Sequence, residues 1–182
     1  MKKFLKWATI VIVVLGVVLF GAYKFMQAQT KKASPETTAI YSENGKELTV
    51  FYCAPSKKGR EIFGGLVPYG EVWRTGANEA TTFTTNKDLQ IDGKILPAGK
   101  YTLWTIPEKD AWTIIWNDKQ YGWGVDFSNK ALREPEADAL QVKVPVQITD
   151  SPVELFTISF EESDNLALVF AWDKTKVAVP IE

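Results

Sequence analysis

The chain has 182 residues, of which 46% are hydrophobic and 13% aromatic, so it can form a packed core and is not a disordered protein. It contains no histidine and one cysteine, which excludes Ser-His-Asp and Cys-His catalysis, zinc sites with histidine ligands and an intrachain disulfide. Six of the 21 basic residues precede Glu36, whereas all 22 acidic residues lie from Glu36 onward, so the rest of the chain has a net charge of −7. We therefore expect no metal, no cofactor and no nucleic-acid partner.

The first 24 residues have the pattern of a membrane anchor. Three lysines precede Trp7, and 17 uncharged residues run to Tyr23 before Lys24. At about 1.5 Å per residue this run just spans a hydrocarbon core, with lysines snorkelling at each end and two aromatic residues at the interfaces. A cleaved signal peptide is the alternative, but the apolar run is long for one and no clear small-x-small site follows. We expect a cytoplasmic tail over 1–6 and an uncleaved anchor over 7–24, with the remainder periplasmic or extracellular.

The remainder reads as a linker followed by one all-β domain. Residues 25–38 are small and polar, which is typical of a linker. From residue 39 onward, short segments alternate apolar and polar residues, as half-buried strands do. Asp92-Gly93 predicts a hairpin turn, and Asp173-Lys174 predicts the turn between the last two strands. We predict that residues 39–182 form an antiparallel β-sandwich or a partly open barrel.

The alternation breaks over "VPYGEVWRTGANEATTF", from Val67 to Phe83. Pro68-Tyr69-Gly70 predicts a turn, and Glu71–Ala80 predicts one or two helical turns. One interpretation is a ligand-contacting surface, in which arginine binds an anionic or carbonyl group, asparagine adds a hydrogen bond and tryptophan stacks. Its residues are Tyr69, Trp73, Arg74, Asn78 and Glu79. The other interpretation is a loop that plugs one end of the domain, with its charged side chains pairing with each other and with backbone carbonyls.

Two further groups are weaker candidates. Trp116, Tyr121 and Trp123 could stack on a sugar, although core packing explains them as well. A carboxylate-dependent hydrolase needs two acids across a cleft, and spacing alone selects no pair. The available acids are Glu71, Glu79, Asp118, Asp126, Glu161 and Glu162.

Two other features favour structural roles. In "SKKGREIFGG", residues 56–65, the basic residues precede the glycines, which is the wrong order for a phosphate-binding loop. Cys53 alternates with Phe51 late in a predicted strand, which indicates a buried structural thiol.

The segments "PSKKGREIFGGLVPYGEVWRTGANEAT", "LPAGKYTLWTIP", "WTIIWN", "VELFTISF" and "AWDKTKVAVPI" resemble the DUF2911 family of bacterial proteins, chiefly from Bacteroidota. The resemblance covers about residues 36–182, and it implies export but transfers no reaction and no catalytic residues. The chain departs from the family pattern in its retained N-terminal anchor and in having cysteine at position 53.

Together these features predict a membrane-anchored extracytoplasmic domain with a non-enzymatic binding or envelope-associated role. The membrane is its expected partner through the N-terminal helix, and a small molecule or saccharide is the expected ligand. The alternative is a carboxylate-dependent hydrolase acting on a saccharide or another component of the cell envelope.

Overall fold

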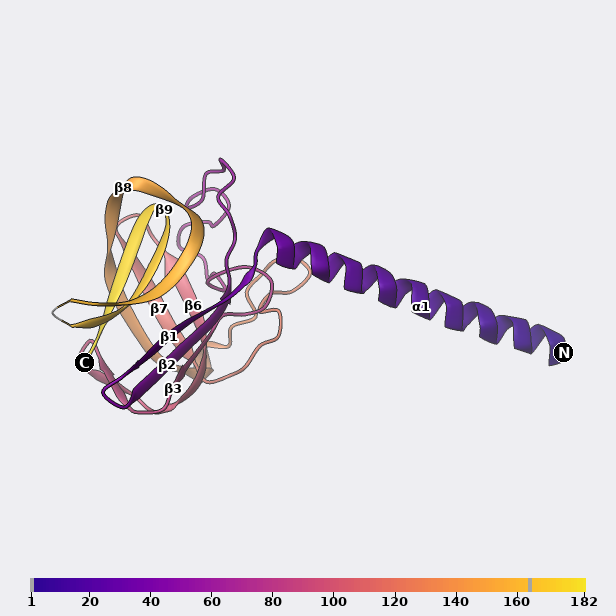
Figure 1. Ribbon diagram of the computed structural model, residues 1–182, viewed down its shortest axis with the longest axis horizontal. Helices are drawn as coiled ribbons and strands as arrows, with labels where there is room; N and C mark the ends of the chain where they lie inside the picture. The colour runs from indigo at the N-terminus through magenta and orange to yellow at the C-terminus, as the bar shows by residue number, and fades with distance from the viewer. Residues whose placement is uncertain (1, 164) are drawn as a thin grey trace. The chain divides into compact units, whose positions relative to one another are not determined.

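The computed structural model describes residues 2–163 and 165–182 and divides into two units at the bond between Ala33 and Ser34 (Figure 1). The first unit is α1, Lys2–Ala33, which by length and composition could be a membrane span or a signal sequence. Residues 25–33, part of the expected linker, continue this helix. Lysines at 31 and 32 suit its C-terminal dipole, and Pro35 disfavours helical geometry at the residue before it, so the helix ends here.

The second unit, Ser34–Glu182, is built from antiparallel strands. Seven of them form one sheet in the order β1-β2-β3-β6-β7-β8-β9, and β4 and β5 form a separate hairpin. Their bounds are β1 Glu36–Glu43, β2 Lys46–Cys53, β3 Thr82–Thr85, β4 Leu89–Ile91, β5 Lys94–Leu96, β6 Gly99–Pro107, β7 Ala111–Asn117, β8 Asp138–Glu162 and β9 Leu166–Ile181, with one 3₁₀ turn, η1, at Pro135–Ala137. The predicted all-β antiparallel fold is confirmed, and of its two forms the sheet takes the partly open barrel.

The 25-residue strand β8 lets the sheet curl (Figure 1). Its first part pairs with β7, and its second part pairs with β9 through two register shifts, between Ile148 and Val153 and between Val153 and Thr157. Such irregularities bend a strand and increase its twist. The curled sheet brings the second part of β8 beside β1 and β2, where the ring of Tyr41 packs on that of Phe160.

Of the two turns that the sequence predicts, the structure contains one and lacks the other. Asp92 and Gly93 both have positive φ, at 51° and 70°, and join β4 to β5 as predicted. The predicted turn at Asp173-Lys174 is wrong, because β9 continues through both residues. Asp173 has a φ of 51° and pairs with Val153, between the two register shifts of β8. Its positive φ therefore belongs to a bulge within a paired strand.

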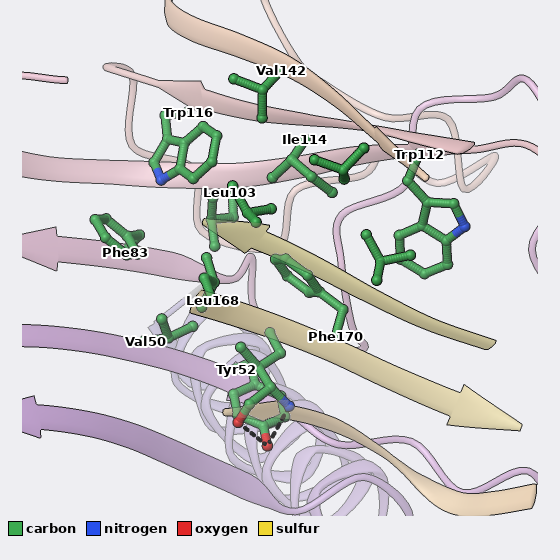
Figure 2. Close-up of a cluster of buried hydrophobic side chains, with 14 of the residues drawn as sticks. Val50, Tyr52, Phe83, Leu103, Trp112, Ile114, Trp116, Val142, Leu168 and Phe170 are labelled. Carbon is green, nitrogen blue, oxygen red and sulfur yellow. Dashed lines mark hydrogen bonds between the residues drawn. The ribbon is translucent and has the colours of Figure 1, made fainter. Parts of the chain in front are cut away.

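The alternating strands enclose one apolar interior. Figure 2 shows Trp112, Ile114 and Trp116 of β7 directed into the same interior as Val50 and Tyr52 of β2. All five side chains are almost completely buried. The hairpin β4–β5 is joined to the end of β9 by paired backbone hydrogen bonds between Gln90 and Glu182, at 3.5 and 2.9 Å. The core is therefore continuous through the unit, and the loops between strands are left to form its surface features.

Candidate functional site

Residues 67–81 belong to the irregular loop between β2 and β3, and residues 82 and 83 begin β3, so the predicted helical turns over Glu71–Ala80 are wrong. Four of its residues adopt positive φ, namely Gly70 at 76°, Thr75 at 58°, Gly76 at 150° and Asn78 at 55°. Each positive φ breaks a right-handed helix. A Cβ on Gly76 would lie 2.9 Å from the carbonyl oxygen of Cys53, so the close approach of two backbones requires glycine here.

Trp73 holds the loop against the core. Its backbone forms a two-hydrogen-bond bridge with Thr105 of β6, at 2.7 and 3.0 Å. Its ring stacks on Trp172 with centroids 5.9 Å apart and meets Phe156 edge-on at 4.9 Å and Trp112 at 6.2 Å. Aromatic pairs of this geometry add to the stabilisation that burial already provides. Trp73 is thus part of the plug at this end of the domain.

Asn78 ties the loop to the start of the domain. Its side chain is buried, and its Nδ2 donates to the carbonyl oxygen of Ser34 at 3.2 Å. Thr81 Oγ1 donates to the carbonyl oxygen of Thr75 at 2.7 Å, which closes the loop on itself. These buried polar groups are satisfied inside the protein, as stable loops require.

The Arg74 side chain points away from the aromatic rings around Trp73 and contacts the loop between β7 and β8. Its Nη1 donates to the carbonyl oxygen of Trp123 at 3.2 Å, and the guanidinium lies 5.7 Å from the centroid of the Trp123 ring. The side chain is half-buried, and burial lowers the pKa of Arg74, while the nearby Cys53 and Glu79 raise it. The result is a guanidinium close to solvent beside an aromatic ring that is 40% exposed.

Cys53 and Glu79 form the inner part of this region. The buried Cys53 thiol donates to Oε2 of Glu79 at 3.3 Å. Burial, together with the hydrogen bond to Glu79 and its negative charge, raises the pKa of Cys53 to about 11. A thiol with this pKa is protonated at neutral pH and is a poor nucleophile. Cys53 therefore contributes a hydrogen bond to the carboxylate and no covalent chemistry.

The structure separates Tyr69 from the other four residues of the predicted surface. Tyr69 is exposed and lies against Gly64, on the neighbouring "SKKGREIFGG" segment. That segment is fixed to the end of the sheet, because Lys57 donates its backbone N–H to Glu154 and forms a 2.6 Å ion pair with Asp173. Lys57 therefore has a structural role in this segment.

The structure also separates the three aromatic residues proposed as a stacking platform. Trp116 lies in the core, and Tyr121 packs edge-on against Trp104 at 5.1 Å. Trp123 alone of the three is exposed, and its partner is Arg74, 49 positions away in the sequence. Local spacing could not reveal that pairing, because two separate loops supply it.

Several candidate acids have structural partners. Asp126 accepts backbone hydrogen bonds from Ser128 and Lys130 within its own turn. Glu161 forms a 2.7 Å ion pair with Lys176, and Glu162 accepts a hydrogen bond from the Tyr41 hydroxyl. Across residues 2–163 and 165–182, no three acidic, cysteine or histidine side chains come together as a metal site would require.

Asp138 is an acid that the sequence did not single out. Burial alone would raise the pKa of Asp138, but hydrogen bonds from Arg133, Asn117 and Gln141 outweigh burial and leave the pKa lowered. Its carboxylate is held by the Arg133 guanidinium at the start of β8. A lowered pKa is the opposite of what a general acid needs, so Asp138 anchors the strand.

The comparisons with known proteins agree with the motifs quoted from the sequence. No curated protein and no solved structure matches the chain. The family model for proteins of unknown function named DUF2911 matches residues 34–181, which begins at the first residue of the β-unit and ends one residue before the end of the chain. The chain therefore belongs to the DUF2911 family.

Proposed function

We propose that this protein is a membrane-anchored, non-enzymatic binding domain whose ligand contacts Arg74. In this proposal α1 stays uncleaved and crosses the membrane, and the β-domain lies outside the cytoplasm. The support for the anchor is an apolar helix with lysines on both sides of the apolar run. The support for a binding role is the position of Arg74 on a loop held by a rigid scaffold, where binding residues commonly occur.

The binding proposal depends on the hydrogen bonding and the partial burial of the Arg74 guanidinium. A guanidinium has five N–H donors in a planar fork. Among the described residues, the carbonyl oxygen of Trp123 is the one protein acceptor to which it donates. The side chain has nevertheless been half-withdrawn from water, and burial lowers its pKa. An anion from solution would therefore find a partly desolvated cation with donors still available.

The neighbouring ring indicates what kind of ligand would fit. A carboxylate or phosphate can accept two parallel hydrogen bonds from a guanidinium. The Trp123 ring, 5.7 Å from the guanidinium, offers a flat face beside it. Aromatic faces stack on the apolar sides of sugar rings and other flat groups. We therefore propose an acidic saccharide, such as a uronic acid, as the ligand class.

Thermal unfolding with matched ligands tests this proposal. Glucuronate should raise the melting temperature of the protein in a concentration-dependent way, glucose should not, and inorganic phosphate reports on simple anion binding. The response to glucuronate should be lost in Arg74→Ala. Arg60→Ala is the control, because it removes the same charge from an exposed side chain that donates to the backbone carbonyls of Ser56 and Lys57 in its own segment. An equal response in all three proteins would disprove the role of Arg74.

The anchor is tested separately. The full-length protein should resist extraction from membranes by alkaline carbonate, and its measured mass should include residues 1–33. In intact cells stripped of any outer layer, added protease should digest the β-domain and leave a protected N-terminal fragment. A mature chain that begins beyond α1 would show a signal peptide instead, and protection of the β-domain would place it in the cytoplasm.

A further inference from the structure

A buried tryptophan on the outer face of the sheet has a hydrogen-bond donor without a partner. Within the part of the chain that the structure describes, three buried indole N–H groups have no acceptor, those of Trp104, Trp112 and Trp116. Trp112 and Trp116 are directed into the apolar core (Figure 2). Trp104 follows the inward-facing Leu103 along β6, so it lies on the opposite face of the sheet. Its N–H is therefore separate from the core, and a buried donor without an acceptor calls for an explanation.

The loop between β7 and β8 covers the Trp104 ring, and we call its residues 122–124 the lid. A Cβ at Gly124 would lie 3.5 Å from Cη2 of Trp104, 3.4 Å from Cβ of Arg74 and 3.1 Å from Cβ of Ala80. The φ of Gly124 is 79°, so a side chain here would be strained as well as crowded. Trp104 and Arg74 therefore border the same glycine of the lid.

Few polar contacts hold the lid to the rest of the domain. The backbone N–H of Ala80 donates to the carbonyl oxygen of Gly122 at 3.0 Å, and Arg74 donates to that of Trp123 at 3.2 Å. Gly122 is exposed, and a Cβ there would meet nothing within 4 Å. A glycine on each side of Trp123 gives the backbone the freedom that an outward movement of the lid requires.

The two ends of the β7–β8 loop are fixed, which confines such a movement to its middle. The Tyr121 hydroxyl accepts the backbone N–H of Glu134 at 2.9 Å and donates to Oδ1 of Asn117 at 3.3 Å. The Nδ2 of Asn117 also donates to the carbonyl oxygen of Glu134 at 2.8 Å. Surface loops whose ends lie close together in this way are frequently functional.

We propose that an acidic saccharide opens the lid by replacing the carbonyl oxygen of Trp123 on the Arg74 guanidinium. The uncovered N–H of Trp104 then donates to a second oxygen of the same ligand. A carboxylate displaces the carbonyl oxygen because charge-assisted hydrogen bonds are the stronger ones. This inference rests on the proposed function and adds Trp104 to it as a specificity-determining residue.

The chemistry of the two donors narrows the ligand class. An indole N–H and a guanidinium donate hydrogen bonds and accept none. The ligand must therefore present a carboxylate to Arg74 and a neutral oxygen beside it to Trp104. A uronic acid meets both requirements, since its ring oxygen and hydroxyl groups lie next to the carboxylate. An amino sugar presents a positive charge and N–H donors instead, so glucosamine should not bind.

Nuclear magnetic resonance tests the inference on the full-length wild-type protein in detergent micelles, titrated with glucuronate. The indole N–H resonance of Trp104 should move downfield as it gains an acceptor, and that of Trp116 should stay in place. The amide of Ala80 should exchange with solvent about tenfold faster at saturation, because its acceptor on Gly122 moves away. The amide of Leu103, which donates 2.8 Å to the carbonyl oxygen of Thr81, is the control and should be unchanged.

Trp104→Phe removes the N–H and should weaken glucuronate binding about tenfold, as expected for one lost hydrogen bond. Trp116→Phe is the matched control and should bind like the wild type, with near-ultraviolet circular dichroism to confirm that both variants are folded. Equal affinity of Trp104→Phe and the wild type would overturn the inference. The N–H would then be left to the Tyr121 ring, which lies edge-on at 5.1 Å.

The measurements on the wild type decide the inference even if Trp104→Phe does not fold. If glucuronate binds through Arg74 but changes neither the Trp104 resonance nor the exchange of Ala80, the lid stays closed. The inference is then wrong and the proposed function stands. If glucuronate does not bind the wild type, the proposed function fails and the inference falls with it.

Discussion

At the scale of single residues, the domain depends on polar atoms that replace missing backbone partners. The hydroxyl of Tyr52 accepts the backbone N–H of Ile158 at 3.0 Å and donates to its carbonyl oxygen at 3.3 Å (Figure 2). At this point one side chain of β2, instead of backbone pairing, satisfies the two backbone groups of a β8 residue. Because the site is buried, neither backbone group can turn to water instead.

We expect Tyr52→Phe to lower the free energy of unfolding by about 1–3 kcal/mol, because it leaves two buried backbone groups without partners. Urea unfolding of the two proteins measures the difference. Tyr41→Phe is the matched control, since its hydroxyl meets Glu162 at the surface, and it should leave the stability unchanged. Equal effects of the two substitutions would contradict the role assigned to Tyr52.

The thiol of Cys53 should be almost inert in the folded protein. With a pKa of about 11, roughly one thiol in a thousand is ionised at about pH 8, and the side chain is buried. Reaction with a chromogenic disulfide reagent should therefore be slow at that pH and should become fast after unfolding in urea. Fast reaction of the native protein would show that the thiol is accessible and ionised.

The same shift predicts a pH dependence of stability. The folded state holds the thiol proton more tightly than the unfolded state, whose pKa is near 9, so its stabilising effect is complete below about pH 9. The effect should be lost as the pH rises toward 11, by roughly 2–3 kcal/mol. Buried tyrosines also titrate in this range, so the measurement compares the protein with Cys53→Ala. Parallel pH profiles of the two proteins would count against this prediction.

At the scale of elements, backbone contacts fix the loop over residues 67–81 as much as side-chain contacts do. Gly76 has a φ of 150°, and its α-carbon faces the carbonyl oxygen of Cys53 at the end of β2. This contact places Arg74 and Asn78 on either side of a fixed point. Arg74 then meets the loop between β7 and β8, while Trp73 packs on Phe156 and Trp172.

Gly76→Ala should destabilise the domain by about 2–4 kcal/mol, because the new methyl group meets a backbone oxygen and φ is unfavourable. Gly59→Ala separates the effect of the unfavourable φ from that of the steric contact. Gly59 also has a positive φ, 70°, but an added Cβ meets nothing within 4 Å, so about 1 kcal/mol is expected there. Thermal or urea unfolding measures both substitutions. A smaller effect at position 76 than at position 59 would mean that the loop can move away from β2.

At the scale of the whole molecule, the β-unit contains its own core and begins at Ser34. Two contacts fix that boundary. The carbonyl oxygen of Ser34 accepts from Asn78, and that of Pro35 accepts the backbone N–H of Ala54 at 2.9 Å. β1 then pairs with β2 from Glu36 onward. The first residues of the domain are therefore part of its structure.

The fragment 34–182 should fold on its own and unfold in one cooperative transition, with an enthalpy of roughly 100 kcal/mol for about 150 residues. The fragment 39–182 is the matched control. It lacks the contacts of Ser34 and Pro35 and the first three β1–β2 pairs, so its melting temperature should be several degrees lower. Calorimetry measures both fragments. Equal melting temperatures would move the domain boundary to residue 39.

The sequence by itself determined the elements whose signals are local. Period-two alternation identified the residues from 39 onward as strands, and Asp92-Gly93 identified the β4–β5 turn, because side-chain direction and positive φ depend on neighbouring residues alone. The apolar N-terminal helix was recognisable from composition for the same reason. The segment around Arg74 could be singled out because it broke that alternation.

Only the tertiary structure decided what depends on distant segments. The sequence showed glycine at position 76 but not the backbone of β2 that requires it, so the loop was taken for helix. Asp173-Lys174 looked like a turn because the opposing irregularity in β8 lies some twenty positions away. The approach of Arg74 to Trp123 joins two separate loops, and that of Cys53 to Glu79 joins the end of β2 to a residue 26 positions later. Contacts of this kind arise from packing the whole chain, and no local pattern of residues encodes them.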